Sequence, residues 1–157
     1  MGIIDASDLN AACTEGGAPV KTILVLEDEP LLLKLMRSLL DRHGYAVLEA
    51  AGAEQAVQQF HNSGGRIDLL VADVGLPGVS GIQVALQLRS ELPHLPVILT
   101  SGYPPNAWSA RDSRHLVKLG VDSVSILLKP FGSRVLLNTV NDLTAARPAE
   151  VLGAAAL

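Results

Sequence analysis

The sequence contains a single cysteine, Cys13, among 157 residues. One cysteine excludes a disulfide within the chain, and the absence of disulfides is typical of proteins in a reducing compartment. The first 20 residues lack the basic start and continuous apolar segment of a signal peptide. No apolar run is long enough to span a bilayer. We therefore expect a cytoplasmic protein that does not enter a membrane.

Aromatic residues and positive charge are also scarce. Aromatic side chains make up 3% of the sequence although hydrophobic residues reach 48%, so the core must consist of Leu, Val, Ile and Ala. Such cores are typical of parallel sheets that are covered on both faces. The 12 Lys and Arg residues against 16 Asp and Glu residues give a formal net charge of −4. Because a nucleic-acid-binding domain usually carries a basic surface, we expect no nucleic-acid partner.

Short apolar runs alternate with amphipathic segments along most of the chain. The apolar runs predict strands at 22–26, 45–49, 67–72, 97–101 and 123–128. Apolar residues at helical spacing, bounded by Pro, Gly and capping residues, predict helices at 30–43, 53–62, 81–91, 107–119 and 133–145. We predict a flexible leader, one folded domain and, beyond Arg147-Pro148, a flexible tail, with the limits 1–20, 21–146 and 147–157.

Five strands that alternate with five helices predict an α/β fold, in which a parallel sheet is covered by helices on both faces. Right-handed crossovers restrict the possible windings. We predict the doubly wound, flavodoxin-like (βα)5 arrangement with strand order 2-1-3-4-5. In this order the carboxyl ends of the first and third strands lie side by side at the switch point, where open α/β folds build their sites.

Acidic residues stand at the carboxyl ends of these two strands. Glu27 and Asp28 follow the first strand, and Asp73 follows the third. Two carboxylates about 4 Å apart repel each other by about 4 kcal/mol at an effective dielectric constant of about 20. Such a cluster therefore requires raised pKa values or a bound positive charge. Carboxylate oxygens are ligands that Mg²⁺ prefers, so the sequence predicts a cation-binding pocket.

Two further strand ends supply complementary groups to the same pocket. Ser101 ends the fourth strand with a hydroxyl, and Lys129 ends the fifth with an ammonium. Together these groups suit a phosphoryl group on an aspartate, because the carboxylate of Asp73 can attack phosphorus while cations neutralise the phosphoryl oxygens. Any one of these residues alone would more simply be a helix cap or a solvated loop residue. Their joint placement favours the site.

Four motifs in this order carry a resemblance to a known family: Glu27-Asp28, Asp73 with Leu76-Pro77-Gly78 and Gly81, Thr100-Ser101-Gly102, and Lys129-Pro130-Phe131. Over about residues 21–145 the chain resembles the receiver domain of bacterial two-component response regulators (CheY-like). The segments Ser101-Gly102-Tyr103 and Lys129-Pro130-Phe131 resemble those of receivers attached to, or partnered with, hybrid histidine kinases.

The resemblance implies a role for each acid of the pocket. Asp73 would be the phosphoacceptor, taking a phosphoryl group from a histidine kinase or a histidine phosphotransfer protein. Asp28 would bind Mg²⁺ directly, Glu27 would hold metal-bound water, and the backbone carbonyl of Gly75 would be a further ligand. The predicted function is thus a phosphorylation switch or phosphate relay that catalyses only its own phosphorylation and dephosphorylation.

The resemblance also implies how the state of the pocket is communicated. Ser101 would be the switch hydroxyl, Lys129 would contact the phosphoryl oxygens, and the Lys129–Pro130 peptide bond would be cis. Phosphorylation would alter the face formed by residues 107–119, 123–128 and 133–145, which would bind a downstream protein or a second copy of the chain. The sequence departs from the family at Ile126, where an aromatic residue is usual, and at Gly75, where a larger side chain is usual.

Two other functions stay open at this point. One is a phosphatase-type enzyme on the same fold, in which Asp73 is a nucleophile that turns over repeatedly. The other is a degenerate receiver that binds partners without being phosphorylated. The intact acidic trio disfavours the second, and stoichiometric labelling as against multiple turnovers would separate the first from a switch.

Overall fold

The computed structural model describes residues 19–156, and for residues 146–156 it describes the backbone alone. Its strands are β1 (Thr22–Leu26), β2 (Ala46–Ala50), β3 (Leu69–Asp73), β4 (Val97–Ser101) and β5 (Val124–Leu128). They form one sheet in the order β2-β1-β3-β4-β5, and every neighbouring pair is parallel. The predicted fold class and strand order are therefore confirmed.

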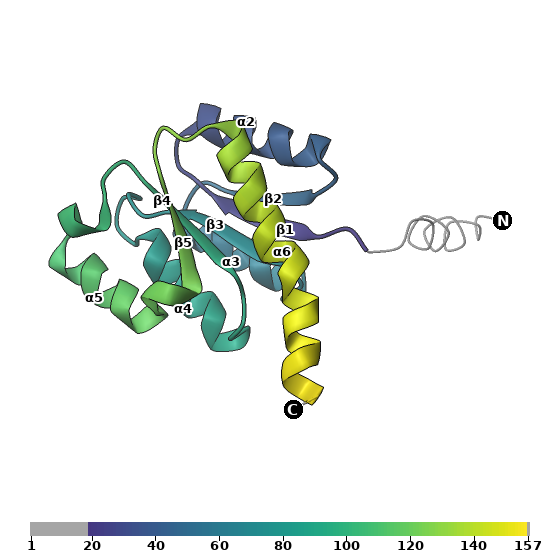
Figure 1. Ribbon diagram of the computed structural model, residues 1–157. Coiled ribbons are helices and arrows are strands. Elements are labelled where there is room, and N and C mark those ends of the chain that lie inside the picture. The colour runs from purple at the N-terminus through teal and green to yellow at the C-terminus, as the bar shows by residue number, and fades with distance from the viewer. Residues whose placement is uncertain (1–18, 157) are drawn as a thin grey trace.

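The helices alternate with the strands (Figure 1). They are α2 (Pro30–Arg42), α3 (Ala53–Asn62), α4 (Gly81–Glu91), α5 (Ala110–Leu119) and α6 (Ser133–Ala156), with short 3-10 turns η1 (Pro105–Ala107) and η2 (Val121–Ser123). Alternate residues of each central strand face opposite sides, because successive side chains of a strand point to opposite faces. Leu24 and Leu26 of β1 pack with α3, α4 and α5, whereas Ile23 and Val25 pack with α2 and α6. Two apolar cores thus hold the sheet between the two helix layers.

The prediction that a helix begins at residue 107 is wrong. A 3-10 turn, η1, occupies Pro105–Ala107, and α5 begins only at Ala110. The start of α5 is set by Ser109, whose hydroxyl accepts a hydrogen bond of 3.0 Å from the backbone N–H of Asp112. A serine cap of this kind satisfies an N–H group that has no partner within the helix. The other boundaries of the strands and of α2, α3 and α4 differ from prediction by two residues at most.

The prediction that the last helix ends at residue 145 is also wrong, because α6 continues to Ala156. Pro148 lacks an N–H group, but the surrounding Ala, Glu and Leu residues are strong helix formers and continue the helix beyond it. The flexibility predicted for residues 147–157 and the domain limits 21–146 remain predictions. The predicted leader, residues 1–20, lies outside the described residues except for its last two.

The register of the sheet brings the carboxyl ends of four strands together. Leu26 is opposite Ala72, so the residue after β1 lies beside Asp73 at the end of β3. In the same way Asp73 is opposite Thr100, and Ser101 is opposite Leu128. The backbone N–H of Lys129 then donates to the carbonyl of Ser101 at 2.8 Å. The sheet itself therefore places the predicted site residues along one edge.

The chain passes very close to itself where α4 begins. A Cβ atom at Gly81 would lie 2.3 Å from the carbonyl oxygen of Asp73 and 2.9 Å from the Cβ of Ala72. Ser80 caps this helix, and its side chain and that of Gln83 form a reciprocal capping box. Glycine at position 81 therefore lets the start of α4 pack directly against the end of β3, the segment that carries Asp73.

Gly81→Ala should lower the free energy of unfolding by about 1–3 kcal/mol, the usual effect of overpacking, because the added methyl group must displace backbone atoms. Urea unfolding followed by circular dichroism measures this loss. Gly102→Ala is the matched control, since a Cβ there meets no atom within 4 Å. An equal loss of stability in both variants would contradict the packing argument.

Candidate functional site

Three carboxylates meet at the edge of the sheet. Each of Glu27, Asp28 and Asp73 offers a carboxylate oxygen, and these oxygens lie within 4.8 Å of one another. Glu27 is 1% exposed and Asp73 is 5% exposed, whereas Asp28 is open to solvent. The predicted acidic cluster is therefore present, with two buried acids and one exposed acid.

Lys129 lies between the two buried acids. Its Nζ atom is 2.9 Å from Oε1 of Glu27 and 3.2 Å from Oδ2 of Asp73. The other oxygen of each acid accepts a backbone N–H: Oε2 of Glu27 from Glu29, and Oδ1 of Asp73 from Gly75, both at 3.0 Å. Because each carboxylate is held at both oxygens, the two buried acids form a fixed array of acceptors. The Lys129–Pro130 bond that follows is cis, as predicted.

Burial and neighbouring charges shift the pKa values of Glu27 and Lys129. Burial is the largest influence on Glu27 and raises its pKa above the ordinary 4.5; the nearby Asp73 carboxylate also raises it, and hydrogen bonds from Lys129 and Glu29 oppose the change. Burial alone would lower the pKa of Lys129, but the hydrogen bond with Glu27 and the charges of both acids outweigh it, so this pKa lies above 10.5. The ammonium thus stays charged. Because it is one positive charge beside three acids, the site can still accept further positive charge.

The donor set fits a small divalent cation. Three carboxylates within reach of one another, one of them exposed, supply the hard oxygen ligands that Mg²⁺ takes from proteins together with water. Of the predicted metal ligands the structure brings together Glu27, Asp28 and Asp73. The direction of the Gly75 carbonyl remains a prediction, while its N–H group already contacts Asp73.

Ser101 makes contacts that sequence reasoning missed. Its hydroxyl bonds to none of the three acids; it donates to the carbonyl of Tyr103 at 2.8 Å and accepts from the Tyr103 N–H at 3.0 Å. The indole Nε1 of Trp108 donates to the same hydroxyl at 3.2 Å. A half-buried indole N–H needs an acceptor, so the chain's single tryptophan so near Ser101 was the available signal.

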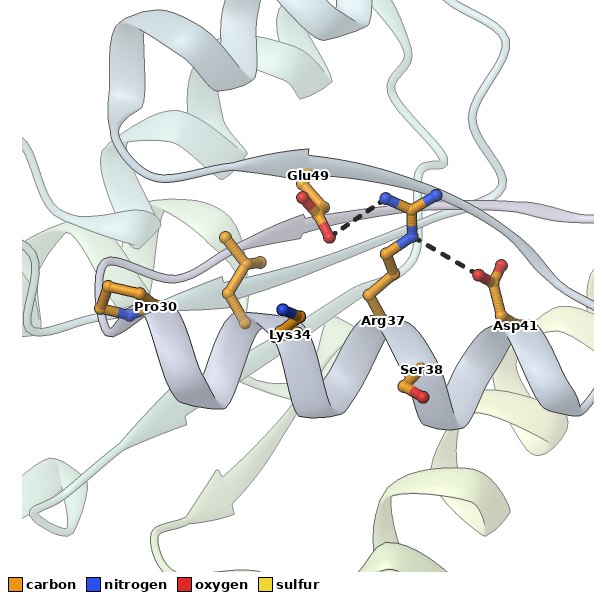
Figure 2. Close-up of a pocket in the computed structure, with 7 residues that line it drawn as sticks. Pro30, Lys34, Arg37, Ser38, Asp41 and Glu49 are labelled. Atoms are coloured by element: carbon orange, nitrogen blue, oxygen red, sulfur yellow. Dashed lines mark hydrogen bonds and ion pairs between the residues drawn. The ribbon is translucent and has the colours of Figure 1, made fainter.

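A hollow lies between α2 and β2 (Figure 2). Arg37 bridges its two sides, with contacts of 3.4 Å to Asp41 of α2 and to Glu49 of β2. Exposed ion pairs of this kind contribute little, about 0–1 kcal/mol each. None of the three clustered acids lines this hollow, so it is separate from the candidate site.

Within residues 19–156 no helix combines the length and apolar character needed to cross a membrane.

Glu27→Gln should become more stable relative to the wild-type protein as the pH rises above 4.5. The raised pKa means that folded Glu27 keeps its proton to a higher pH than unfolded Glu27, so ionisation above 4.5 favours the unfolded chain. Gln cannot ionise and does not lose this stability. Urea unfolding of both proteins in chelator, from below pH 4.5 to neutral pH, measures the difference. A difference that stays constant or shrinks with rising pH would contradict the assignment.

Comparisons with known proteins agree with this geometry. The family model of the response regulator receiver domain matches residues 23–141, which is more than half of the chain. The response regulator GtcR of Aneurinibacillus migulanus is 33% identical over 111 residues, 71% of this chain and 42% of GtcR. The sensor kinase CckA of Brucella abortus is 33% identical over 122 residues, 78% of this chain and 12% of CckA. The chain thus spans less than half of the length of these two curated relatives.

A solved structure with the same fold is that of the response regulator TrrA from Thermotoga maritima, described as a complex with Mg²⁺ and BeF. It is 28% identical, has a TM-score of 0.65, and the match covers 79% of this chain and 99% of TrrA. The family model, the two curated relatives and the shared fold all lead to one assignment. The chain belongs to the family of response regulator receiver domains, the signalling switches of two-component systems that interact with histidine kinases or phosphotransfer proteins.

Proposed function

We propose that Asp73 is the residue of this receiver that accepts a phosphoryl group. The observation that carries the proposal is the contact of 3.2 Å between Lys129 and Asp73, in a pocket where Glu27 and Asp28 lie within 4.8 Å of the same carboxylate. A lone buried aspartate would need only the ammonium. Two additional acids at that place repel its charge, and a bound cation would offset this repulsion.

In the proposed reaction an oxygen of the Asp73 carboxylate forms a bond to phosphorus while the bond from phosphorus to the imidazole nitrogen of a phosphohistidine breaks. The electron pair of the broken bond stays on that nitrogen, and the product is an acyl phosphate. Lys129, whose Nζ atom lies 3.2 Å from Oδ2 of Asp73, would contact the phosphoryl oxygens. Ser101 would supply a hydroxyl from the neighbouring strand.

Mg²⁺ is the proposed cofactor, with Asp28 and Asp73 as ligands, Glu27 as the holder of metal-bound water and the Gly75 carbonyl as a further ligand. When bound, the ion would neutralise charge that develops on the transferred group. The exposure of Asp28 lets the ion reach the pocket from solvent, and burial of Glu27 keeps that acid oriented. The TrrA structure, a complex with Mg²⁺ and BeF, supports this choice.

We propose that the protein acts as a switch with one phosphoryl group per chain, and not as an enzyme that turns over external phosphate esters. Its phosphoryl donor would be a cytoplasmic histidine kinase or phosphotransfer protein. The output surface would be formed by α5, β5 and α6, which carry the exposed apolar side chains of Val117, Leu128 and Val135. Exposed apolar side chains on these elements would favour a protein partner or a second copy of the chain.

Incubation with acetyl phosphate and Mg²⁺ should add one phosphoryl group to the wild-type protein and none to Asp73→Asn, because the amide cannot form the acyl phosphate. Intact-protein mass spectrometry measures the adduct, and its lability to base identifies it as an acyl phosphate. Asp41→Asn, which removes an exposed acid on α2, is the matched control and should label like the wild type.

Equal labelling of Asp73→Asn would show that another residue accepts the phosphoryl group. Repeated release of phosphate from small esters, with little adduct present, would favour the phosphatase-type enzyme. Absence of any adduct, while partner binding persists, would favour a degenerate receiver.

Mg²⁺ should raise the melting temperature of the wild-type protein, because a ligand that binds only the folded state stabilises it by about 2.7 kcal/mol at 100 times its dissociation constant. Asp28→Asn should lose most of this shift, since it removes the exposed ligand of the cluster. Differential scanning calorimetry with Mg²⁺ and with chelator measures both. An equal shift in the variant would place the ion elsewhere.

A further inference from the structure

Trp108 stands at the junction between the site loop and α5. It is the only tryptophan of the chain. Its backbone N–H closes η1 by donating to the carbonyl of Pro105 at 3.1 Å, and the next residue, Ser109, is the cap at which α5 begins. Its ring is half-buried and packs against the core on the α3, α4 and α5 side of the sheet. A shift of this ring would therefore act directly on the start of α5.

The indole N–H of Trp108 is shared between two acceptors. It lies 3.2 Å from Oγ of Ser101 and 2.9 Å from the carbonyl oxygen of Tyr103. Ser101 in turn donates its own proton to that carbonyl at 2.8 Å. Among the residues that the structure describes, Trp108 is the only side chain that hydrogen-bonds Ser101. The three groups form a closed triangle at the end of β4.

This triangle and a phosphoryl contact exclude each other. A serine hydroxyl has one proton, and Ser101 gives that proton to the Tyr103 carbonyl. To donate to a phosphoryl oxygen on Asp73, the hydroxyl must turn its proton away from this carbonyl. Turning the proton alone would leave Oγ as an acceptor for the indole, so the coupling requires the Ser101 side chain to rotate and carry Oγ toward Asp73. The Trp108 indole then keeps only the carbonyl. The hydrogen bonding of Trp108 therefore depends on where the Ser101 hydroxyl points.

The neighbouring strand offers Ser101 no comparable side-chain partner. Ser101 is opposite Leu128 of β5, and Leu99 of the same strand is opposite Ile126. Neither Leu128 nor Ile126 has a side-chain group that can form a hydrogen bond. The hydrogen bonds of the Ser101 side chain therefore run along its own loop to Tyr103 and Trp108, and not to a side chain of β5.

We propose that Trp108 is a positioning residue that couples the orientation of the Ser101 hydroxyl to the N-terminal end of α5. In the unphosphorylated protein the indole N–H holds Ser101 and the Tyr103 carbonyl together. When Ser101 turns to the phosphoryl group, the Trp108 indole donates to the Tyr103 carbonyl alone and its ring shifts. This shift moves η1 and the Ser109 cap. This inference rests on the proposed phosphorylation of Asp73.

The first test follows the indole N–H resonance of the full chain by nitrogen–proton NMR, in which a single tryptophan gives a single indole signal. Beryllofluoride with Mg²⁺ is the probe, as a stable mimic of the phosphoryl group, and fluorine NMR measures its uptake separately. The indole resonance should shift on uptake in the wild-type protein. It should not shift in Ser101→Ala, and Ser101→Thr, which restores a hydroxyl, should recover the shift.

The second test uses Trp108→Phe, which keeps an aromatic ring and removes the N–H donor. Hydrogen exchange measured by mass spectrometry should show that beryllofluoride changes the protection of residues 105–119 in the wild type and that this change is lost in Trp108→Phe, although the variant still takes up the probe. Tyr103→Phe is the matched control, because Tyr103 takes part only through its backbone and its side chain is 69% exposed. It should behave like the wild type.

The outcomes separate this inference from the proposed function. Uptake of beryllofluoride without a shift of the indole resonance, or the same shift in Ser101→Ala, overturns the coupling and leaves phosphorylation intact. A hydrogen-exchange response in Trp108→Phe equal to that of the wild type also overturns the coupling and leaves phosphorylation intact. If Ser101→Ala takes up no beryllofluoride, the exchange response of Trp108→Phe is the deciding test. Failure of the wild-type protein to take up either beryllofluoride or a phosphoryl group overturns the function and the coupling together.

Discussion

The candidate site depends on the contact of Lys129 with two buried carboxylates, those of Glu27 and Asp73. One ammonium faces three acids, Glu27, Asp28 and Asp73, so two negative charges stay uncompensated when all three are ionised. Like charges at such distances repel by several kcal/mol unless a counter-charge is present. Burial raises the pKa of Glu27, and the charge of the nearby Asp73 carboxylate adds to this shift. A divalent cation would balance the remaining charge, which is why the pocket is suited to metal and phosphoryl chemistry together.

The sheet keeps this unfavourable cluster in place. The parallel register aligns the ends of β1 and β3 and of β4 and β5, and buried Leu, Ile and Val residues on both faces hold the strands. At Gly81 the start of α4 packs directly against the backbone of Asp73, which leaves that carboxylate little freedom to move away. Energy gained by packing the two cores thus offsets the repulsion at the edge.

The sequence predicted the sheet and the acids because both depend on patterns of neighbouring residues. Apolar runs mark buried strands, and the residue after each run is necessarily at the edge of a parallel sheet. The start of α5 escaped prediction because it depends on the hydroxyl of Ser109 and on a 3-10 turn, neither of which changes the apolar spacing. The orientation of Ser101 escaped it too, since Trp108, seven residues away, fixes that hydroxyl through a turn whose path is not evident from composition.

The proposed role of Ser101 requires its two arrangements to be similar in energy. In the described structure Ser101 takes part in three neutral hydrogen bonds, each with a net contribution of about 0.5–1.5 kcal/mol. A bond to a charged phosphoryl oxygen contributes about 1.5–3 kcal/mol. One charged bond alone would scarcely outweigh three neutral ones. The indole N–H of Trp108, which lies 2.9 Å from the Tyr103 carbonyl in this structure, would reduce the loss by staying on that carbonyl in the proposed second arrangement. With that carbonyl satisfied in both proposed states, a phosphoryl group on Asp73 would decide which state prevails.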